Sequence, residues 1–169
     1  SERHNQRSTL SHSTVVIDEK NSSEVWGGFR VARRANVLNV KTKQSDNDIE
    51  VSACHDGYKR LKGKPIHNRE WIISKNEIII KDKITGKGIH RISSILPLHP
   101  EVSIINTQDN SVELEVNGKS VKVVFEGSGK LQIVPSQYHP EFGLSIDNKQ
   151  LINDYNGSLP LTRITKIIW

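Results

Sequence analysis

The sequence contains very little sulfur, because its 169 residues include one cysteine, Cys54, and no methionine. A single cysteine excludes an internal disulfide, and it also excludes a zinc site built from several thiolates within the chain. The absence of methionine extends to position 1, so we expect the chain to be processed or to be a piece of a longer protein.

Long apolar runs are also absent. No stretch reaches the roughly 18 apolar residues of a membrane-spanning helix, and the first ten residues are too polar and charged for a signal peptide. The sequence therefore predicts no membrane span. It also lacks the GxSxG, HExxH and CxxC motifs and a P-loop, so it carries none of the common signatures for hydrolytic, metal-dependent or nucleotide chemistry.

Positive charge is concentrated in the first half of the chain. Residues 1–85 carry 16 Lys and Arg against 11 Asp and Glu, whereas residues 86–169 carry 8 of each class. A basic surface attracts polyanions, either nucleic acid or an acidic polysaccharide. Ordinary solubility accounts for the same excess equally well, so composition alone leaves the partner open.

The apolar residues recur at period two, which is the pattern of half-buried β-strands. In residues 111–125 they alternate with charged residues on either side of Asn117-Gly118, the typical pair of a type I′ hairpin turn. A second hairpin is predicted over residues 70–82, where two isoleucine-rich runs flank Lys75-Asn76.

Further strands are predicted at residues 13–18, 25–43, 49–54, 88–96, 102–106, 130–135 and 162–168. Residues 25–43 are too long for one strand, so we expect Gly27-Gly28 to mark a bulge or bend. Residues 149–154 are compatible with one helical turn. Many short strands and almost no helix predict a single all-β domain over residues 1–169, with antiparallel sheets packed as a sandwich or barrel.

Two segments combine basic side chains with aromatic or titratable ones. Trp26 lies near Arg30 and Arg34, and an aromatic ring beside guanidinium groups can stack on a sugar and pair with its carboxylate. His55 and Tyr58 flank an Asp-Gly turn and could serve as acid, base or hydrogen-bonding groups. A solvated strand face and an ordinary polar turn would show the same residues, so both interpretations stay open.

The histidines are scattered singly along the chain, at positions 4, 12, 55, 67, 90, 99 and 139. An isolated histidine is more often structural than a ligand, although distant strands can bring metal ligands together. His12 belongs to a basic, hydroxyl-rich stretch over residues 7–18, which could equally be a loop that enters an edge strand.

Several of these segments resemble a known family. R-S-T-x-x-H-S-T-V-V-I-D at 7–18 is similar to a signature of heparinase II/III-like polysaccharide lyases, with Ser13 where the family usually has Asn. FRVARRA at 29–35, HDGYKRL at 55–61 and YHPEFG at 138–143 resemble further stretches of bacterial members, in the same order. The resemblance spans essentially the whole chain.

The resemblance implies the C-terminal antiparallel β-sandwich of a larger enzyme whose N-terminal α/α-toroid this chain lacks. Such enzymes cleave uronic-acid-containing polysaccharides by β-elimination, with the substrate cleft between the two domains. The resemblance further implies an acidic polysaccharide and the protein's own toroid as partners, and a periplasmic or secreted location. It places no catalytic residue in this chain, so the isolated chain is expected to be inactive.

For the site residues, the resemblance implies that His12 is one of three zinc ligands in the full-length protein, the other two lying before residue 1. No tightly bound metal is therefore expected in this chain alone. The basic first half becomes the surface that attracts the glycan. We accordingly predict that the substrate-binding residues are Arg7, Trp26, Arg30, Arg34, His55 and Tyr58.

Two other classes of function compete with the lyase. The first is a non-catalytic carbohydrate-binding or structural β-sandwich, which would bind glycan without a toroid. The second is nucleic-acid binding, which is disfavoured because aromatic residues make up only 5% of the chain and no nucleic-acid-binding motif is present. We therefore predict no nucleic-acid partner.

Overall fold

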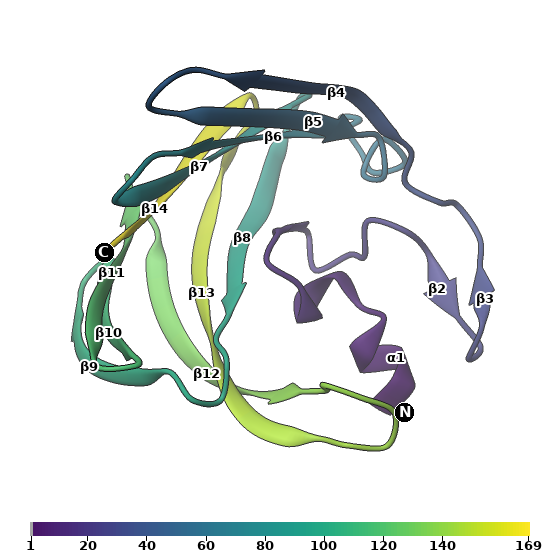
Figure 1. Cartoon of the computed structure of the whole chain (residues 1–169). Helices are drawn as coiled ribbons and strands as arrows, with labels where there is room; N and C mark the ends of the chain where they lie inside the picture. The colour runs from purple at the N-terminus through teal and green to yellow at the C-terminus, as the bar shows by residue number, and fades with distance from the viewer. Residues whose placement is uncertain (1) are drawn as a thin grey trace.

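The computed structural model describes residues 2–169, and in that range it consists almost entirely of antiparallel strands (Figure 1). The predicted all-β fold is confirmed, with helix limited to two short segments near the N-terminus. In chain order the elements are α1 Glu2–Gln6, the 3₁₀ helix η1 Thr9–Ser11, β1 Val15–Ile17, β2 Val25–Trp26, β3 Arg30–Val31, β4 Val37–Gln44, β5 Ile49–His55, β6 Ile66–Ile73, β7 Glu77–Thr85, β8 Ile89–Pro97, β9 Ser103–Gln108, β10 Ser111–Val116, β11 Lys119–Glu126, β12 Lys130–Tyr138, β13 Ile146–Ser158 and β14 Leu161–Ile168.

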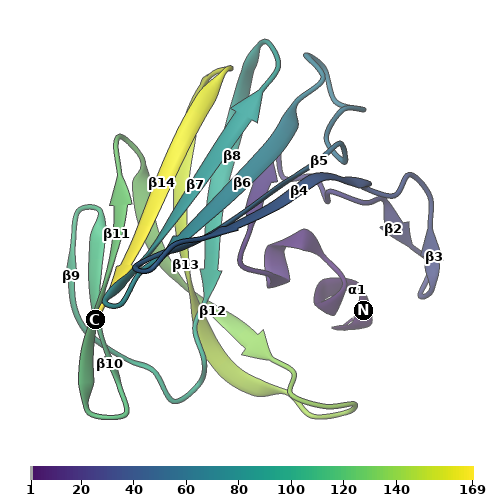
Figure 2. The same cartoon turned by 45° about the horizontal axis from the view of Figure 1, so that its top comes forward.

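The strands form two main sheets and a small hairpin. The larger sheet has the order β4-β5-β6-β7-β14-β11-β10-β9, the smaller one has the order β1-β8-β13-β12, and β2 pairs with β3. Figure 2 shows the N-terminal segment and the β2–β3 hairpin together on one side of the two sheets. The architecture is therefore an antiparallel sandwich with a basic N-terminal extension beside it.

The core lies between the two sheets in two clusters of buried apolar side chains. One contains Val15, Ile17, Tyr58, Ile84, Ile92 and Leu159, and the other contains Leu98, Val112, Leu114, Val123, Phe125 and Leu151. Each cluster draws residues from both sheets. Full burial of one such aliphatic side chain contributes about 1.5–3 kcal/mol to the free energy of folding, so these clusters stabilise the packing of the two sheets.

Both predicted hairpins are present. Strands β10 and β11 flank Asn117 and Gly118, whose φ angles are 51° and 74°, as a type I′ turn requires. Strands β6 and β7 pair so that Ile73 lies opposite Ile78 across the turn that holds Lys75-Asn76.

The long strand candidate at residues 25–43 is broken where expected. Gly27 and Gly28, with φ angles of 51° and 71°, turn the chain between β2 and β3, and β4 then begins at Val37. The small hairpin thus projects before the chain enters the larger sheet.

The helical turn expected at residues 149–154 is wrong, because these residues lie in β13. That strand is paired on both edges, with β8 and β12, so its backbone bonding overrides the polar composition of the segment. Leu151 and Asn153 are fully buried, and Asn153 accepts a hydrogen bond from the buried Arg163 guanidinium on β14. The hydrogen bond between Asn153 and Arg163 thus occupies an inward position of β13 where an apolar residue would be expected from the sequence pattern of a strand.

Candidate functional site

His12 borders an open hollow where the N-terminal segment meets the end of the smaller sheet. The hollow has a volume of about 530 Å³, and its lining includes Gln6, His12, Ser13, His99, Tyr138 and His139. Three segments far apart in the sequence thus contribute a histidine each. Since imidazole can donate or accept a hydrogen bond, such a hollow suits a ligand rich in hydroxyl and carboxylate groups.

The hollow unites two of the motifs singled out in the sequence. His12 and Ser13 come from residues 7–18, and Tyr138 and His139 come from residues 138–143. His99 packs edge-on against Tyr138, with 5.0 Å between ring centroids, and His139 Nδ1 lies 3.3 Å from the carbonyl oxygen of Leu144. The His12 side chain is exposed and free to face a ligand.

The loop that contains His12 is held in place by a hydrogen bond from an arginine on β6. Arg69 Nη1 donates to the Ser13 carbonyl oxygen at 2.6 Å. The same guanidinium donates twice to Asp82 on β7, from Nε at 2.6 Å and from Nη2 at 2.8 Å. Because a bidentate arginine–carboxylate pair fixes orientation as well as distance, Asp82 sets the position of the Ser13 backbone through Arg69.

A chain of hydrogen bonds leads from Asp82 back to His55. His67 Nε2 lies 2.6 Å from Asp82 Oδ1, and His67 Nδ1 lies 3.1 Å from His55 Nε2. At the far end, the Gly57 N–H donates to His55 Nδ1 at 3.3 Å. A backbone N–H at one end and a carboxylate at the other allow one consistent assignment, in which both imidazoles are neutral and carry their proton on Nε2.

Two groups of this hydrogen-bond network, His55 and Asp82, have pKa values that depart from their ordinary range. Burial, reinforced by the neighbouring His67, lowers the pKa of His55 to about 4. Burial alone would raise the pKa of Asp82, but hydrogen bonds from His67 and Arg69 hold it below its ordinary value. Near neutral pH the network therefore contains a charged Asp82 and an uncharged His55.

Tyr58 belongs to the core. Its side chain is fully buried, its hydroxyl donates to the Val15 carbonyl oxygen at 2.9 Å, and burial raises the pKa of the phenol. It contacts His55 ring to ring, with 5.5 Å between centroids. As the structure places it, Tyr58 has no free surface for a sugar, so we do not retain it among the substrate-binding candidates.

The rest of the 55–61 motif holds the N-terminal segment in place. The Arg60 guanidinium donates to the carbonyl oxygens of Asn21, Ser22 and Gly57, and its Nε lies 3.3 Å from Glu24 Oε1. Tyr58 and Arg60 of this motif therefore have structural roles in this chain.

The predicted aromatic–arginine surface is built by the β2–β3 hairpin. Trp26 is 50% exposed, and the Arg30 guanidinium lies over its ring at 4.9 Å. Phe29 is 77% exposed, and Arg3 lies over it at 3.9 Å. Arg7 donates to the carbonyl oxygens of Gly28 and Phe29, which anchors the hairpin to the N-terminal segment.

The structure thus separates the predicted site residues into groups. Arg7, Trp26 and Arg30 gather at the hairpin, and the exposed Arg34 follows it along the chain. His55 and Tyr58 lie behind, in the network and the core, and His12 lies at the hollow. The predicted roles of Arg7, Trp26, Arg30, Arg34 and His55 in substrate binding and of His12 in metal binding stay predictions, whereas Tyr58 is fully buried.

Sequence inspection missed Arg69, Asp82, His99 and His139 as members of the site. For one pair a signal was available: the predicted hairpin around Lys75-Asn76 places Arg69 directly opposite Asp82. His12 meets His99 and His139 because the start of β1 and the ends of β8 and β12 lie at the same end of the smaller sheet, and no local pattern encodes this pairing.

The side chains of this chain do not complete a metal site by themselves. Among the side chains of residues 3–169, no three His, Cys, Asp or Glu converge in a way that could hold a metal ion. His12, His99 and His139 line one hollow but do not form such a group. We therefore derive no chemical step through a metal from this chain.

Comparison with known families decides what this sandwich is. The family model described as heparinase II/III-like, C-terminal, matches residues 1–166. The chain belongs to the heparinase II/III-like C-terminal family. A search of curated proteins finds no match.

Solved structures show the same fold for this heparinase II/III-like domain. It superposes on heparan sulfate lyase HepC from Pedobacter heparinus with a TM-score of 0.78 at 14% identity, covering 99% of this chain and 25% of that one. For the BT4657 gene product, described as a heparinase III, the values are 0.77, 16%, 99% and 25%. For a further heparinase III they are 0.73, 17%, 96% and 24%.

The heparinase II/III-like domain thus spans about a quarter of the length of the solved structures that it matches. At this level of identity the likeness establishes the fold and not the substrate. In the part of the chain that the structure describes, no helix is long and apolar enough to cross a membrane.

Proposed function

We propose that this domain forms one wall of the substrate cleft in an enzyme that cleaves uronic-acid-containing polysaccharides by β-elimination. The observation that carries the proposal is the His12 hollow, because it brings together two of the motifs that resemble lyases on one polar, solvent-open surface. Membership of the heparinase II/III-like family supports it, as does the resemblance in fold to enzymes named heparan sulfate lyase and heparinase III.

The chemistry requires three groups around the sugar. The uronate carboxylate must be neutralised so that the neighbouring C5 proton becomes acidic, a base must remove that proton, and an acid must protonate the departing glycosidic oxygen. We assign this chain a binding and positioning part, with the base and acid supplied by the rest of the protein. His12 faces the ligand, and the Asp82–Arg69–Ser13 contacts hold its loop.

Arginines on the hairpin and just after it provide the attraction for a polyanion. Arg30 and Arg34 are exposed, so their guanidinium groups can pair with carboxylate or sulfate groups of a passing chain. Long-range attraction of this kind weakens as salt rises, because the Debye length falls to about 8 Å at physiological ionic strength. In this proposal the full-length protein works outside the cytoplasm, in the periplasm or secreted, where polysaccharides are met.

Zinc also enters as a proposal, with His12 as one ligand and the others supplied by residues outside this chain. A bound zinc ion would order the loop and add positive charge near the uronate. Metal analysis of the full-length protein and of its His12→Ala variant tests this assignment directly, because loss of stoichiometric zinc in the variant is expected.

The test of the function is a paired assay. The full-length protein and this chain are each incubated with a panel of uronic-acid polysaccharides, including heparan sulfate and alginate, while the ultraviolet absorbance of unsaturated uronate is followed. The proposal predicts product formation by the full-length protein on at least one substrate and none by this chain. The proposal would be overturned if the full-length protein released no unsaturated uronate from any acidic glycan.

One observation favours a second candidate, a non-catalytic carbohydrate-binding module. Trp26 and Phe29 are exposed aromatic rings, each covered on one face by an arginine, and exposed aromatics are suited to stacking on sugars. This alternative predicts that the isolated chain binds glycan with the same affinity as the full-length protein. The lyase proposal predicts much weaker binding by the isolated chain, since half of the cleft is missing.

A further inference from the structure

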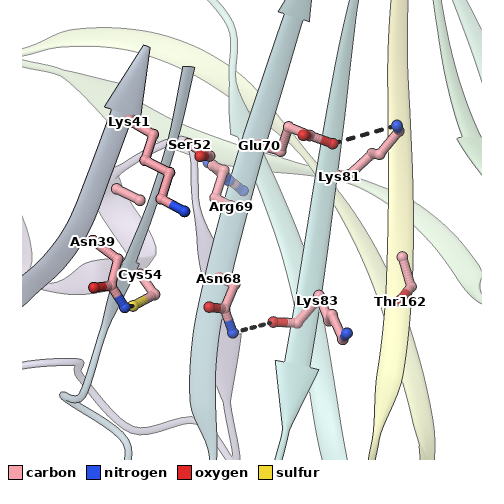
Figure 3. Close-up of a pocket in the computed structure, with 11 residues that line it drawn as sticks. Asn39, Lys41, Ser52, Cys54, Asn68, Arg69, Glu70, Lys81, Lys83 and Thr162 are labelled. Carbon is pink, nitrogen blue, oxygen red and sulfur yellow. Dashed lines mark hydrogen bonds and ion pairs between the residues drawn. The ribbon is translucent and has the colours of Figure 1, made fainter. Parts of the chain in front are cut away.

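A second hollow lies on the face of the larger sheet that points away from the core. It has a volume of about 540 Å³ and crosses strands β4, β5, β6, β7 and β14 (Figure 3). Its polar lining includes Asn39, Lys41, Ser52, Asn68, Lys83 and Thr162. None of these residues takes part in the His12 hollow, which is built from the N-terminal segment and the smaller sheet.

Strand register explains why these side chains form rows across the sheet. Lys41 pairs with Ser52, which pairs with Glu70, which pairs with Lys81. Two residues along the strands, and so on the same face, Asn68 pairs with Lys83, and Lys83 pairs with Thr162. With adjacent strands about 4.8 Å apart, the first row extends for about 14 Å and the second for about 10 Å, which is enough for a short oligosaccharide.

A bulge in β4 shapes the edge of this hollow. The register with β5 shifts between Leu38 and Lys41. Asn39 in the bulge has a φ of 54°, which lies in the left-handed region that residues other than glycine rarely adopt. Its amide reaches over Cys54, with Nδ2 3.7 Å from Sγ. Bulges of this kind re-aim side chains and are frequent beside functional sites.

The lining leaves positive charge and hydrogen-bonding groups available to a ligand. Lys81 is neutralised by Glu70 at 3.3 Å. Lys41 and Lys83 form no ion pair with the side chains of residues 3–169, and the hydroxyls of Ser52 and Thr162 have no hydrogen-bond partner in that same range. Two ammonium groups and two hydroxyl groups on this face are thus available to a ligand.

We propose that this outer hollow is a second binding site for an acidic oligosaccharide, with Lys41 and Lys83 pairing with its carboxylate or sulfate groups. Asn68, Ser52 and Thr162 hydrogen-bond the sugar hydroxyls. The inference rests on the proposed function for its ligand class, since it places on this face the same type of glycan that the protein would cleave elsewhere. The site holds a distant stretch of a long chain while another stretch occupies the cleft, which raises effective concentration.

The experiment is a lysine footprint on the full-length protein. The protein is acetylated briefly with and without a heparin-derived hexasaccharide, or with an unsulfated uronic-acid hexasaccharide, and the acetylation rate of each lysine is read by mass spectrometry. We expect protection of Lys41 and Lys83 by at least threefold, reversed by added salt, and none at the exposed Lys119 on β11. Protection by both probes assigns recognition to carboxylates, and protection by the first alone assigns it to sulfates.

A variant measurement completes the test. Lys41→Ala with Lys83→Ala should weaken binding of a long chain about tenfold and leave cleavage of a short substrate unchanged, whereas Lys119→Ala should change neither. The proposal is overturned if the probes leave both lysines unprotected, or if both already resist acetylation without glycan because another domain covers them. Absence of cleavage by the full-length protein, with the footprint intact, would reject the proposed function alone.

Discussion

The buried Asp82 offers the sharpest test of how the site is held. Its side chain is 1% exposed and accepts hydrogen bonds from His67 Nε2 at 2.6 Å, from Arg69 Nε at 2.6 Å and from Arg69 Nη2 at 2.8 Å. Asp82→Asn preserves the shape of the side chain but removes its charge, and it turns an amide N–H₂ toward a guanidinium. Arg69 is then a poorly compensated charge whose side chain is only 11% exposed.

The magnitude follows from the burial of the pair. Removing one partner of a buried ion pair costs about 3–5 kcal/mol. We expect the lower end, ~3 kcal/mol, because Arg69 keeps its bond to the Ser13 carbonyl oxygen and retains some contact with water. Urea unfolding of this chain measures the loss as a lower transition midpoint at unchanged slope.

Glu70→Gln is the matched control, because it breaks a pair with Lys81 in which each side chain is 40% exposed. An exposed pair of this kind contributes about 0.2–1 kcal/mol, so the control should unfold almost like the unmodified chain. If Asp82→Asn also loses less than about 1 kcal/mol, the carboxylate does not anchor the network and the reasoning fails.

Three further predictions concern His55, Tyr58 and Trp26. Because the pKa of His55 is lowered to about 4, its contribution to the free energy of unfolding should be fully present above the ordinary pKa of 6.5. That contribution should be lost progressively as the pH falls from 6.5 to about 4. His55→Gln should flatten this part of a plot of unfolding free energy against pH. Tyr58→Phe should cost about 1–3 kcal/mol in urea unfolding by leaving the buried Val15 carbonyl unpaired, without weakening glycan binding; a selective loss of binding would return Tyr58 to the site. Trp26→Ala should leave the unfolding midpoint within about 0.5 kcal/mol, as is usual for exposed positions, but weaken glycan binding measured by calorimetry, and unchanged binding would remove the hairpin from the binding surface.

Most of the strands could be predicted from local sequence patterns. The Asn117-Gly118 turn and the alternation around it specify β10 and β11 without outside help, and the glycine pair at 27–28 marks the break before β4. Strand β13 was not predicted, because its inward positions include the polar Asn153, which accepts a hydrogen bond from Arg163 of the opposite sheet. A buried polar pair of this kind exists only once both sheets are assembled, so no window of sequence reveals it.

The candidate site was less predictable, for a related reason. Tyr58 looks like a polar group on a turn, yet its burial depends on β1 packing over it to offer the Val15 carbonyl oxygen. His55 and His67 meet as cross-strand neighbours of β5 and β6, whose register is set by an irregular connection rather than by a standard turn. Family resemblance located His12, but the partners around it come from long-range folding.

The central claim, that this domain lines the cleft of an acidic-polysaccharide lyase, is tested most directly by cleavage kinetics of the full-length protein carrying His12→Ala. The matched control is His4→Ala, because His4 is an exposed histidine outside the lining of the hollow. The account predicts that the rate of unsaturated uronate formation falls by at least tenfold in His12→Ala and stays unchanged in His4→Ala. Equal rates in the unmodified protein and both variants would contradict it.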